Sequence, residues 1–86
     1  MTDEAAAVYD LKGLKCPLPV MRTRKRLARL PAGARLSILT TDPLATLDIP
    51  HFCRQEGHKL ESQTTLPDGH RFVICKGRRG GEQQNP

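Results

Sequence analysis

The chain passes from its first strand to its first helix at Lys12-Gly13-Leu14-Lys15-Cys16-Pro17-Leu18-Pro19. Residues 8–11, just before this stretch, predict a short strand, and residues 12–15 predict the turn that leaves it. A helix then begins with Cys16 at its N-cap and continues to about Leu30. Pro17 fits the first helical position, where its missing N–H costs no helical hydrogen bond. The junction therefore places Cys16 at the start of a helix.

The predicted first helix has an apolar face and a basic face. The apolar stripe recurs at helical spacing and consists of Val20, Thr23, Leu27 and Leu30. The opposite face consists of Arg22, Lys25, Arg26 and Arg29. This basic face is either a solvated helix surface or a docking surface for an acidic partner, and both interpretations stay open. Residues 31–33, Pro-Ala-Gly, end the helix.

The rest of the chain predicts one more helix and three more strands. Alternating apolar residues over 36–41 predict a second strand, and Asp42-Pro43 predicts a turn. A second helix follows from about Thr46 to Glu56, with Pro50 tolerated because it falls in the first turn. Two final strands, residues 58–65 and 70–76, are joined by a hairpin turn at residues 66–69.

The predicted order of elements is β-α-β-α-β-β. Because each β-α-β connection crosses over right-handedly, both helices fall on the same face of the sheet. The fold class is therefore an α/β (α+β) two-layer sandwich, a four-stranded mixed sheet with two helices on one face. One domain is expected over residues 6–77, with a flexible N-terminus at 1–5 and a disordered tail at 78–86, which contains no apolar residue.

The chain of 86 residues carries 14 Lys and Arg against 9 Asp and Glu, which gives a formal charge of +5. A basic surplus favours acidic partners, either protein or nucleic acid, without choosing between them. With 1 Tyr, 2 Phe and no Trp, the chain has almost no aromatic platform on which bases could stack. We therefore expect no direct stable binding of nucleic acid.

The sequence predicts a cytoplasmic protein without membrane association. Residues 3 and 4 are Asp and Glu, whereas a secretory signal begins with basic residues. No apolar stretch approaches the ~20 residues of a membrane span. The cysteines, Cys16, Cys53 and Cys75, are odd in number and widely spaced. In a reducing compartment this argues against a disulfide framework.

Cys16 is the predicted chemical centre. At a helix N-cap, unpartnered N–H groups and the helix dipole stabilise a thiolate or persulfide anion and lower the cysteine pKa from about 8.5. Because Pro17 and Pro19 carry no N–H, the nearest free donors are expected on Leu18 and Val20. Pro17 also stiffens the junction, so that an exposed sulfur beside the apolar Leu18 suits docking into another protein's active site.

The sequence places no helper base beside Cys16, since His51, His58 and His70 lie far along the chain. A cysteine hydrolase needs a base that activates its nucleophile. A carrier needs only a nucleophilic sulfur, because attack on a donor's persulfide follows the logic of thiol–disulfide exchange. The structural alternative is that Cys16 is a tolerated N-cap residue, although Ser, Thr, Asp or Asn would cap a helix better.

The positions of the other reactive side chains indicate structural roles. Cys53 shares the inner face of the second helix with Ile49 and Phe52, so core packing is predicted, with a second sulfur-handling role as the alternative. Cys75 is predicted to pack in a strand. His51, Cys53 and His58 fit no standard zinc spacing, so no metal site is predicted.

The chain resembles the TusA (SirA-like) family of sulfur-carrier proteins. The resemblance covers roughly residues 8–77, and it is carried by residues 11–21 with their Cys-Pro-Leu-Pro motif, then by Asp42-Pro43, residues 48–53 and residues 57–60. The Asp-Ile-Pro-His-Phe-Cys segment at 48–53 brings the match closer to TusA itself than to distant relatives.

The resemblance implies a sulfurtransferase that holds sulfur as a persulfide on Cys16, with Pro17 and Pro19 as supports and no other cofactor. A cysteine desulfurase or a rhodanese-like protein would donate the sulfur, and an acceptor protein would receive it. The best-known route ends in 2-thiouridine of tRNA, whereas other members serve sulfur oxidation or molybdenum-cofactor enzymes. Leu18 departs from the acidic residue of the tRNA-thiolation members, which leaves the pathway open. A regulatory or nucleic-acid-binding module that uses the basic helix is the alternative, and it would not need Cys16.

Overall fold

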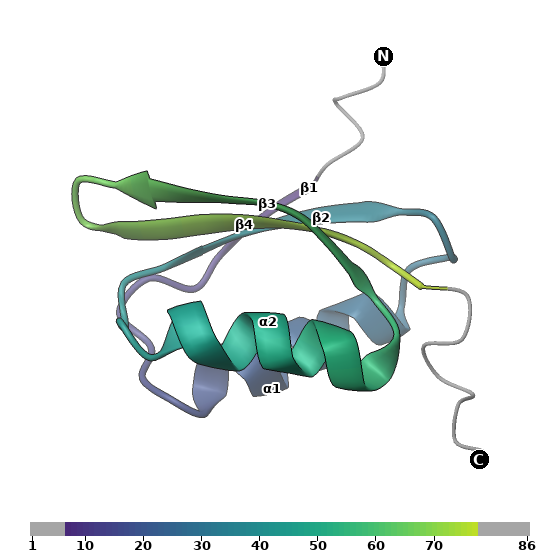
Figure 1. The fold of residues 1–86 in the computed structure, drawn as a ribbon, viewed down its shortest axis with the longest axis horizontal. Coiled ribbons are helices and arrows are strands. Elements are labelled where there is room, and N and C mark those ends of the chain that lie inside the picture. The colour runs from purple at the N-terminus through teal and green to yellow at the C-terminus, as the bar shows by residue number, and fades with distance from the viewer. Residues whose placement is uncertain (1–6, 78–86) are drawn as a thin grey trace.

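The computed structural model of the chain describes residues 7–77. The elements in chain order are β1 (Ala7–Asp10), α1 (Leu18–Ala28), β2 (Arg35–Thr40), α2 (Ala45–Glu56), β3 (Lys59–Leu66) and β4 (Gly69–Cys75). The strands form one sheet in the order β1-β2-β4-β3, with β1 and β2 parallel and the other neighbours antiparallel. Both helices cover the same face of this sheet (Figure 1).

The predicted two-layer α+β sandwich with a mixed four-stranded sheet is therefore confirmed. The strand boundaries fall within one or two residues of the predicted ones. The predictions for the two ends, a flexible segment at 1–5 and a disordered tail at 78–86, lie outside the described residues.

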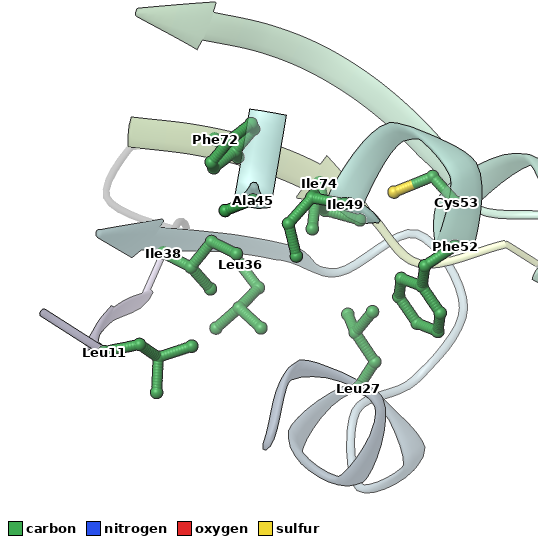
Figure 2. Packing of buried hydrophobic residues seen from close by; sticks show 10 residues of the cluster. All are labelled: Leu11, Leu27, Leu36, Ile38, Ala45, Ile49, Phe52, Cys53, Phe72 and Ile74. Carbon is green, nitrogen blue, oxygen red and sulfur yellow. The ribbon is translucent and has the colours of Figure 1, made fainter. Parts of the chain in front are cut away.

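The hydrophobic core fills the space between the sheet and the helices. Successive residues of a strand point to opposite faces, so alternate residues of β2 and β4 turn toward the helices. The buried apolar residues are Leu11, Leu27, Leu36, Ile38, Ala45, Ile49, Phe52, Cys53, Phe72 and Ile74 (Figure 2). On α1 the predicted apolar stripe is confirmed, since Thr23 and Leu27 are buried while Val20 and Leu30 are partly buried against the core.

The start of α1 differs from the prediction. Its N-cap is Pro17, and the first helical residue is Leu18, so Cys16 lies one position before the cap. The N–H of Leu18 donates to the carbonyl of Lys15 at 2.8 Å, which closes a turn ahead of the helix. The Cys16–Pro17 peptide bond is cis. The N-cap position predicted for Cys16 is therefore wrong, because this local turn occupies the residues that would have begun the helix.

The second helix begins one residue earlier than predicted, at Ala45, so Pro50 lies in its interior. The early start follows from a turn in which the N–H of Ala45 donates to the carbonyl of Asp42 at 3.0 Å. The expectation that Pro50 belongs to the first turn is wrong, and its missing N–H leaves the Thr46 carbonyl without its usual helical donor. Gly57 ends the helix with a φ of 80°, a left-handed conformation that favours glycine.

Candidate functional site

Cys16 lies exposed in the loop between β1 and α1, and two carboxylates from a distant segment hold it. Its thiol donates a hydrogen bond to Oδ2 of Asp48, 2.9 Å away in the first turn of α2. Its backbone N–H donates to Oδ2 of Asp42 at 2.6 Å. The start of the second helix therefore fixes both the backbone and the side chain of Cys16.

The environment of Cys16 disfavours its thiolate. The hydrogen bond to Asp48 raises the pKa of the Cys16 thiol, because ionisation would remove the donated proton and place a negative charge beside a carboxylate. The negative charges of Asp48 and Asp42 act in the same direction. The expected lowering of this pKa by the helix N-terminus is wrong, since the helix starts beyond Cys16 and the carboxylates are nearer to the sulfur.

Asp42 anchors the loop that carries Cys16. Its carboxylate accepts the N–H of Cys16 and, at 3.1 Å, the N–H of Leu44. These two bonds hold the pKa of Asp42 below its usual range, because both stabilise the ionised carboxylate. The turn predicted at Asp42-Pro43 thus reaches back 26 residues to the cysteine.

The predicted supports of Cys16 take different positions. Pro19 is buried and Val20 is partly buried against the core, whereas Pro17 and Leu18 are exposed. The N–H of Leu18 already bonds to the carbonyl of Lys15, so Leu18 is not the free donor that was expected. Its side chain is open to solvent.

Four exposed large apolar side chains belong to the two segments that hold Cys16, and they are Leu18, Met21, Leu44 and Leu47. Leu18 and Met21 come from the start of α1, and the other two come from the segment that carries Asp42 and Asp48. Leu47, beside Asp48, is 68% exposed, and all four are large apolar side chains open to solvent. Exposed apolar side chains are typical of a protein-contact surface where they form one continuous patch.

A hollow of about 220 Å³ lies between the two helices, next to the sulfur. Its lining residues are Cys16, Pro17, Val20, Arg24, Asp48, His51, Phe52 and Gln55. His51 thus comes to the same hollow as Cys16, which its distance in sequence did not indicate. His58 and His70 lie elsewhere: Nδ1 of His58 accepts the N–H of Gly77 at 3.0 Å, and the His70 ring lies 6.2 Å from that of Phe72.

Sequence reasoning missed Asp48, the acceptor for the thiol proton. A usable signal was present, because residues 48–53 carry part of the family resemblance and an acidic residue in a helix's first turn is a common feature. What the sequence did not reveal is that the first turn of α2 meets the loop before α1.

The other two cysteines lie apart from this site, and all three are free thiols. Cys53 is only 2% exposed within the core, and burial raises the pKa of its thiol to about 11 (Figure 2). Cys75 is half-buried at the end of β4, with its sulfur 3.6 Å from the carbonyl of Gly33. Over residues 7–77, no three His, Cys, Asp or Glu side chains gather as a metal-binding group would.

The basic face predicted on α1 is also present as a surface feature. Four of its side chains, with one tyrosine, line a separate hollow of about 340 Å³, and these residues are Tyr9, Arg22, Lys25, Arg26 and Arg29. Neither helix of the described part has the length and hydropathy needed to cross a membrane.

The fold and the site define a small α+β domain that presents one exposed cysteine at the junction of β1 and α1. The family model for sulfurtransferase TusA matches residues 7–76. The crystal structure of a SirA-like protein from Desulfitobacterium hafniense is 26% identical, covers 83% of this chain and 97% of its own, and superposes with a TM-score of 0.71. The chain belongs to the TusA family, which confirms the resemblance and gives it a sulfur-transfer role.

Proposed function

We propose that the protein carries sulfur as a persulfide on Cys16, taking it from a cysteine desulfurase or a rhodanese-like donor and giving it to an acceptor protein. The observation that carries this proposal is the position of Cys16. It is the exposed cysteine of the three, and it lies at the meeting point of both helix starts with its thiol proton directed at Asp48. No cofactor is needed beyond the covalent persulfide.

The loading step conserves atoms and electrons. The Cys16 sulfur attacks the outer sulfur of the donor's persulfide, a new S–S bond forms, and the donor's own S–S bond breaks. At 2.9 Å, Asp48 lies within reach of the thiol proton, so it accepts this proton during the attack. The departing donor thiolate takes up the proton. A thiol and a persulfide thereby exchange one sulfur atom, with no outside oxidant or reductant.

The unloading step runs the same exchange toward the acceptor. An acceptor thiolate attacks the terminal sulfur of the Cys16 persulfide, and Cys16 recovers its proton as it leaves. The favoured destination is 2-thiouridine of tRNA, with sulfur oxidation and molybdenum-cofactor enzymes as alternatives. In each case the exposed apolar side chains of Leu18, Met21, Leu44 and Leu47 are available for contact with the partner protein, and the basic face of α1 provides further contacts.

Intact-mass spectrometry tests the proposal directly. After incubation with a cysteine desulfurase and cysteine, the chain should gain about 32 Da, the mass of one sulfur, and lose it on reduction. The gain should be absent in Cys16→Ser and present in the matched control Cys75→Ser. Sulfur that still accumulates on Cys16→Ser, or none on the unmodified chain, contradicts the proposal.

A further inference from the structure

The basic hollow, lined by Tyr9, Arg22, Lys25, Arg26 and Arg29, has no part in the chemistry at Cys16. It forms where α1 passes the edge strand β1, which contributes Tyr9, whereas α1 and its C-cap contribute the cations. Its volume of about 340 Å³ and its concave shape distinguish it from a row of cations standing separately in solvent. Four converging cations in one hollow suit an anionic ligand.

Arg26 is held in place before any ligand arrives. Its guanidinium carbon lies 4.0 Å from the centroid of the Tyr9 ring. Stacking of this kind occupies the face of the guanidinium and leaves its in-plane N–H groups free, and this planar fork matches the two oxygens of a carboxylate. An ordered Arg26 loses less side-chain freedom on binding, which favours association.

The charge of the hollow is not neutralised within the described part of the chain. The α1 sequence contains no Asp or Glu, and the ion pairs of residues 7–77 join Arg24 to Glu56 and Arg35 to Glu61. Arg22, Lys25, Arg26 and Arg29 lie three and four positions apart, a spacing at which like charges repel on a helix. The helix dipole favours cations in the last turn, but Arg22 lies too far from that end to benefit.

We propose that the basic hollow binds an acidic helix of the protein that exchanges sulfur with Cys16, and this inference rests on the proposed function. From Arg22 to Arg29 the cations extend seven residues, about 10 Å at 1.5 Å per residue. Carboxylates with the same spacing on a partner helix would face them one to one. Nucleic acid fits less well, because the one ring in the hollow, Tyr9, is partly buried against the core and has Arg26 over one face, which leaves little ring surface for a base.

The placement of charge around α1 favours one position for an acidic partner. Asp42 and Asp48 lie against Cys16, and Asp48 lines the hollow between α1 and α2, whereas the cations line the hollow between α1 and β1. An acidic partner helix placed beside Cys16 would meet two carboxylates and be repelled, whereas in the basic hollow it is attracted. Complementary charge of this kind sets the register of a complex and speeds its formation.

A peptide titration tests the site. The probe is a helical peptide with four Glu at positions i, i+3, i+4 and i+7, added at low salt to the ¹⁵N-labelled Cys16→Ser chain, which cannot carry sulfur. Amide shifts should concentrate at Tyr9 and residues 21–29, and affinity should fall at least tenfold in Arg22→Glu/Arg26→Glu. The neutral pair Arg22→Gln/Arg26→Gln should give a smaller loss.

The matched control is Lys59→Glu/Arg71→Glu, the same total charge change at two exposed positions on β3 and β4. It should keep most of the affinity. Equal losses in Lys59→Glu/Arg71→Glu and Arg22→Glu/Arg26→Glu, or no binding at all, overturn the inference. An RNA oligonucleotide that binds more tightly than the peptide, and is lost in the same double variant, overturns it in favour of nucleic acid.

Sulfur uptake separates this inference from the proposed function. Arg22→Glu/Arg26→Glu should load from cysteine persulfide, a small donor that needs no docking, as fast as the unmodified chain, but at least tenfold more slowly from the protein donor. Equal loading from the protein donor overturns the docking inference alone. Failure of the unmodified chain to load from either source overturns the proposed function instead.

Discussion

The thiol of Cys16 and the carboxylate of Asp48 are joined by a 2.9 Å hydrogen bond across 32 residues of sequence. This bond links the loop before α1 to the first turn of α2, so the tertiary fold rather than local sequence sets the state of the sulfur. It keeps the thiol protonated at rest and provides an acceptor for the proton when the sulfur attacks. The predictions that follow begin with this pair.

Replacing Asp48 with Asn should lower the pKa of Cys16. The amide carries no charge, so both the hydrogen bond to a carboxylate and the repulsion of the thiolate are lost. The pH dependence of alkylation by iodoacetamide gives the pKa, and its midpoint should move to lower pH in Asp48→Asn. Asp68→Asn, in the exposed β3–β4 turn, is the matched control and should not move it. An unchanged midpoint in Asp48→Asn would show that the bond is absent in solution.

The three cysteines should differ in reactivity in the folded chain. Cys16 is exposed, Cys75 is half-buried and Cys53 is buried with its pKa raised to about 11. Reaction with a thiol reagent should therefore modify Cys16 first and Cys53 only after unfolding. Peptide mapping at successive times gives the order. Modification of Cys53 or Cys75 as fast as Cys16 would contradict the assignment of the sulfur-bearing residue.

Lys76 should contribute measurably to stability. Its Nζ donates to the carbonyls of Leu27 at 2.8 Å and Leu30 at 2.9 Å, which satisfies carbonyls at the end of α1. Lys76→Met should lower the free energy of unfolding by about 1.5–3 kcal/mol, the range for hydrogen bonds to a charged group. Urea denaturation measures this, with Lys59→Met on the exposed edge strand β3 as the control. If Lys76→Met and Lys59→Met lowered the free energy of unfolding equally, the loss would come from the removed charge and not from the two hydrogen bonds.

Acid should destabilise the fold through His58. Burial, together with the nearby charge of Lys76, holds the pKa of His58 below its usual 6.5. The unfolded chain therefore binds a proton first, so stability is complete above about pH 6.5 and falls as the pH drops toward the folded-state pKa. Urea midpoints at pH 7.5 and 5.5 measure the loss. The difference between the two urea midpoints should be smaller in His58→Gln and unchanged in His51→Gln, where the side chain is exposed. The reverse result would contradict the prediction.

Most of the fold was predictable because the sequence periods are clear. The alternation of apolar residues in β2 and the apolar stripe of α1 show which face of each element is buried in the core. Right-handed crossover connections then place both helices on one side of the sheet. The start of α1 was less predictable, because cap rules assign Cys16 to the helix and do not reveal the turn that Lys15 and Leu18 close.

The candidate site was predictable in its nucleophile but not in its electrostatics. Cys16 could be identified from its motif, since a cysteine before Pro-Leu-Pro needs a reason to be there. Asp48 reaches the sulfur, and His51 reaches the hollow beside it, only through the packing of α2 beside α1, which no local pattern encodes. For this reason the helix dipole, judged alone, gave the wrong direction for the thiol pKa.

The protonated state of the Cys16 thiol also affects how readily the protein is oxidised when it carries no sulfur. Peroxides and other small oxidants attack thiolates, and repeated oxidation of a cysteine to sulfinic or sulfonic acid is irreversible. With Asp48 retaining the proton on Cys16, the unloaded protein is shielded from such damage between deliveries. Oxidative inactivation should therefore be slow in the free chain.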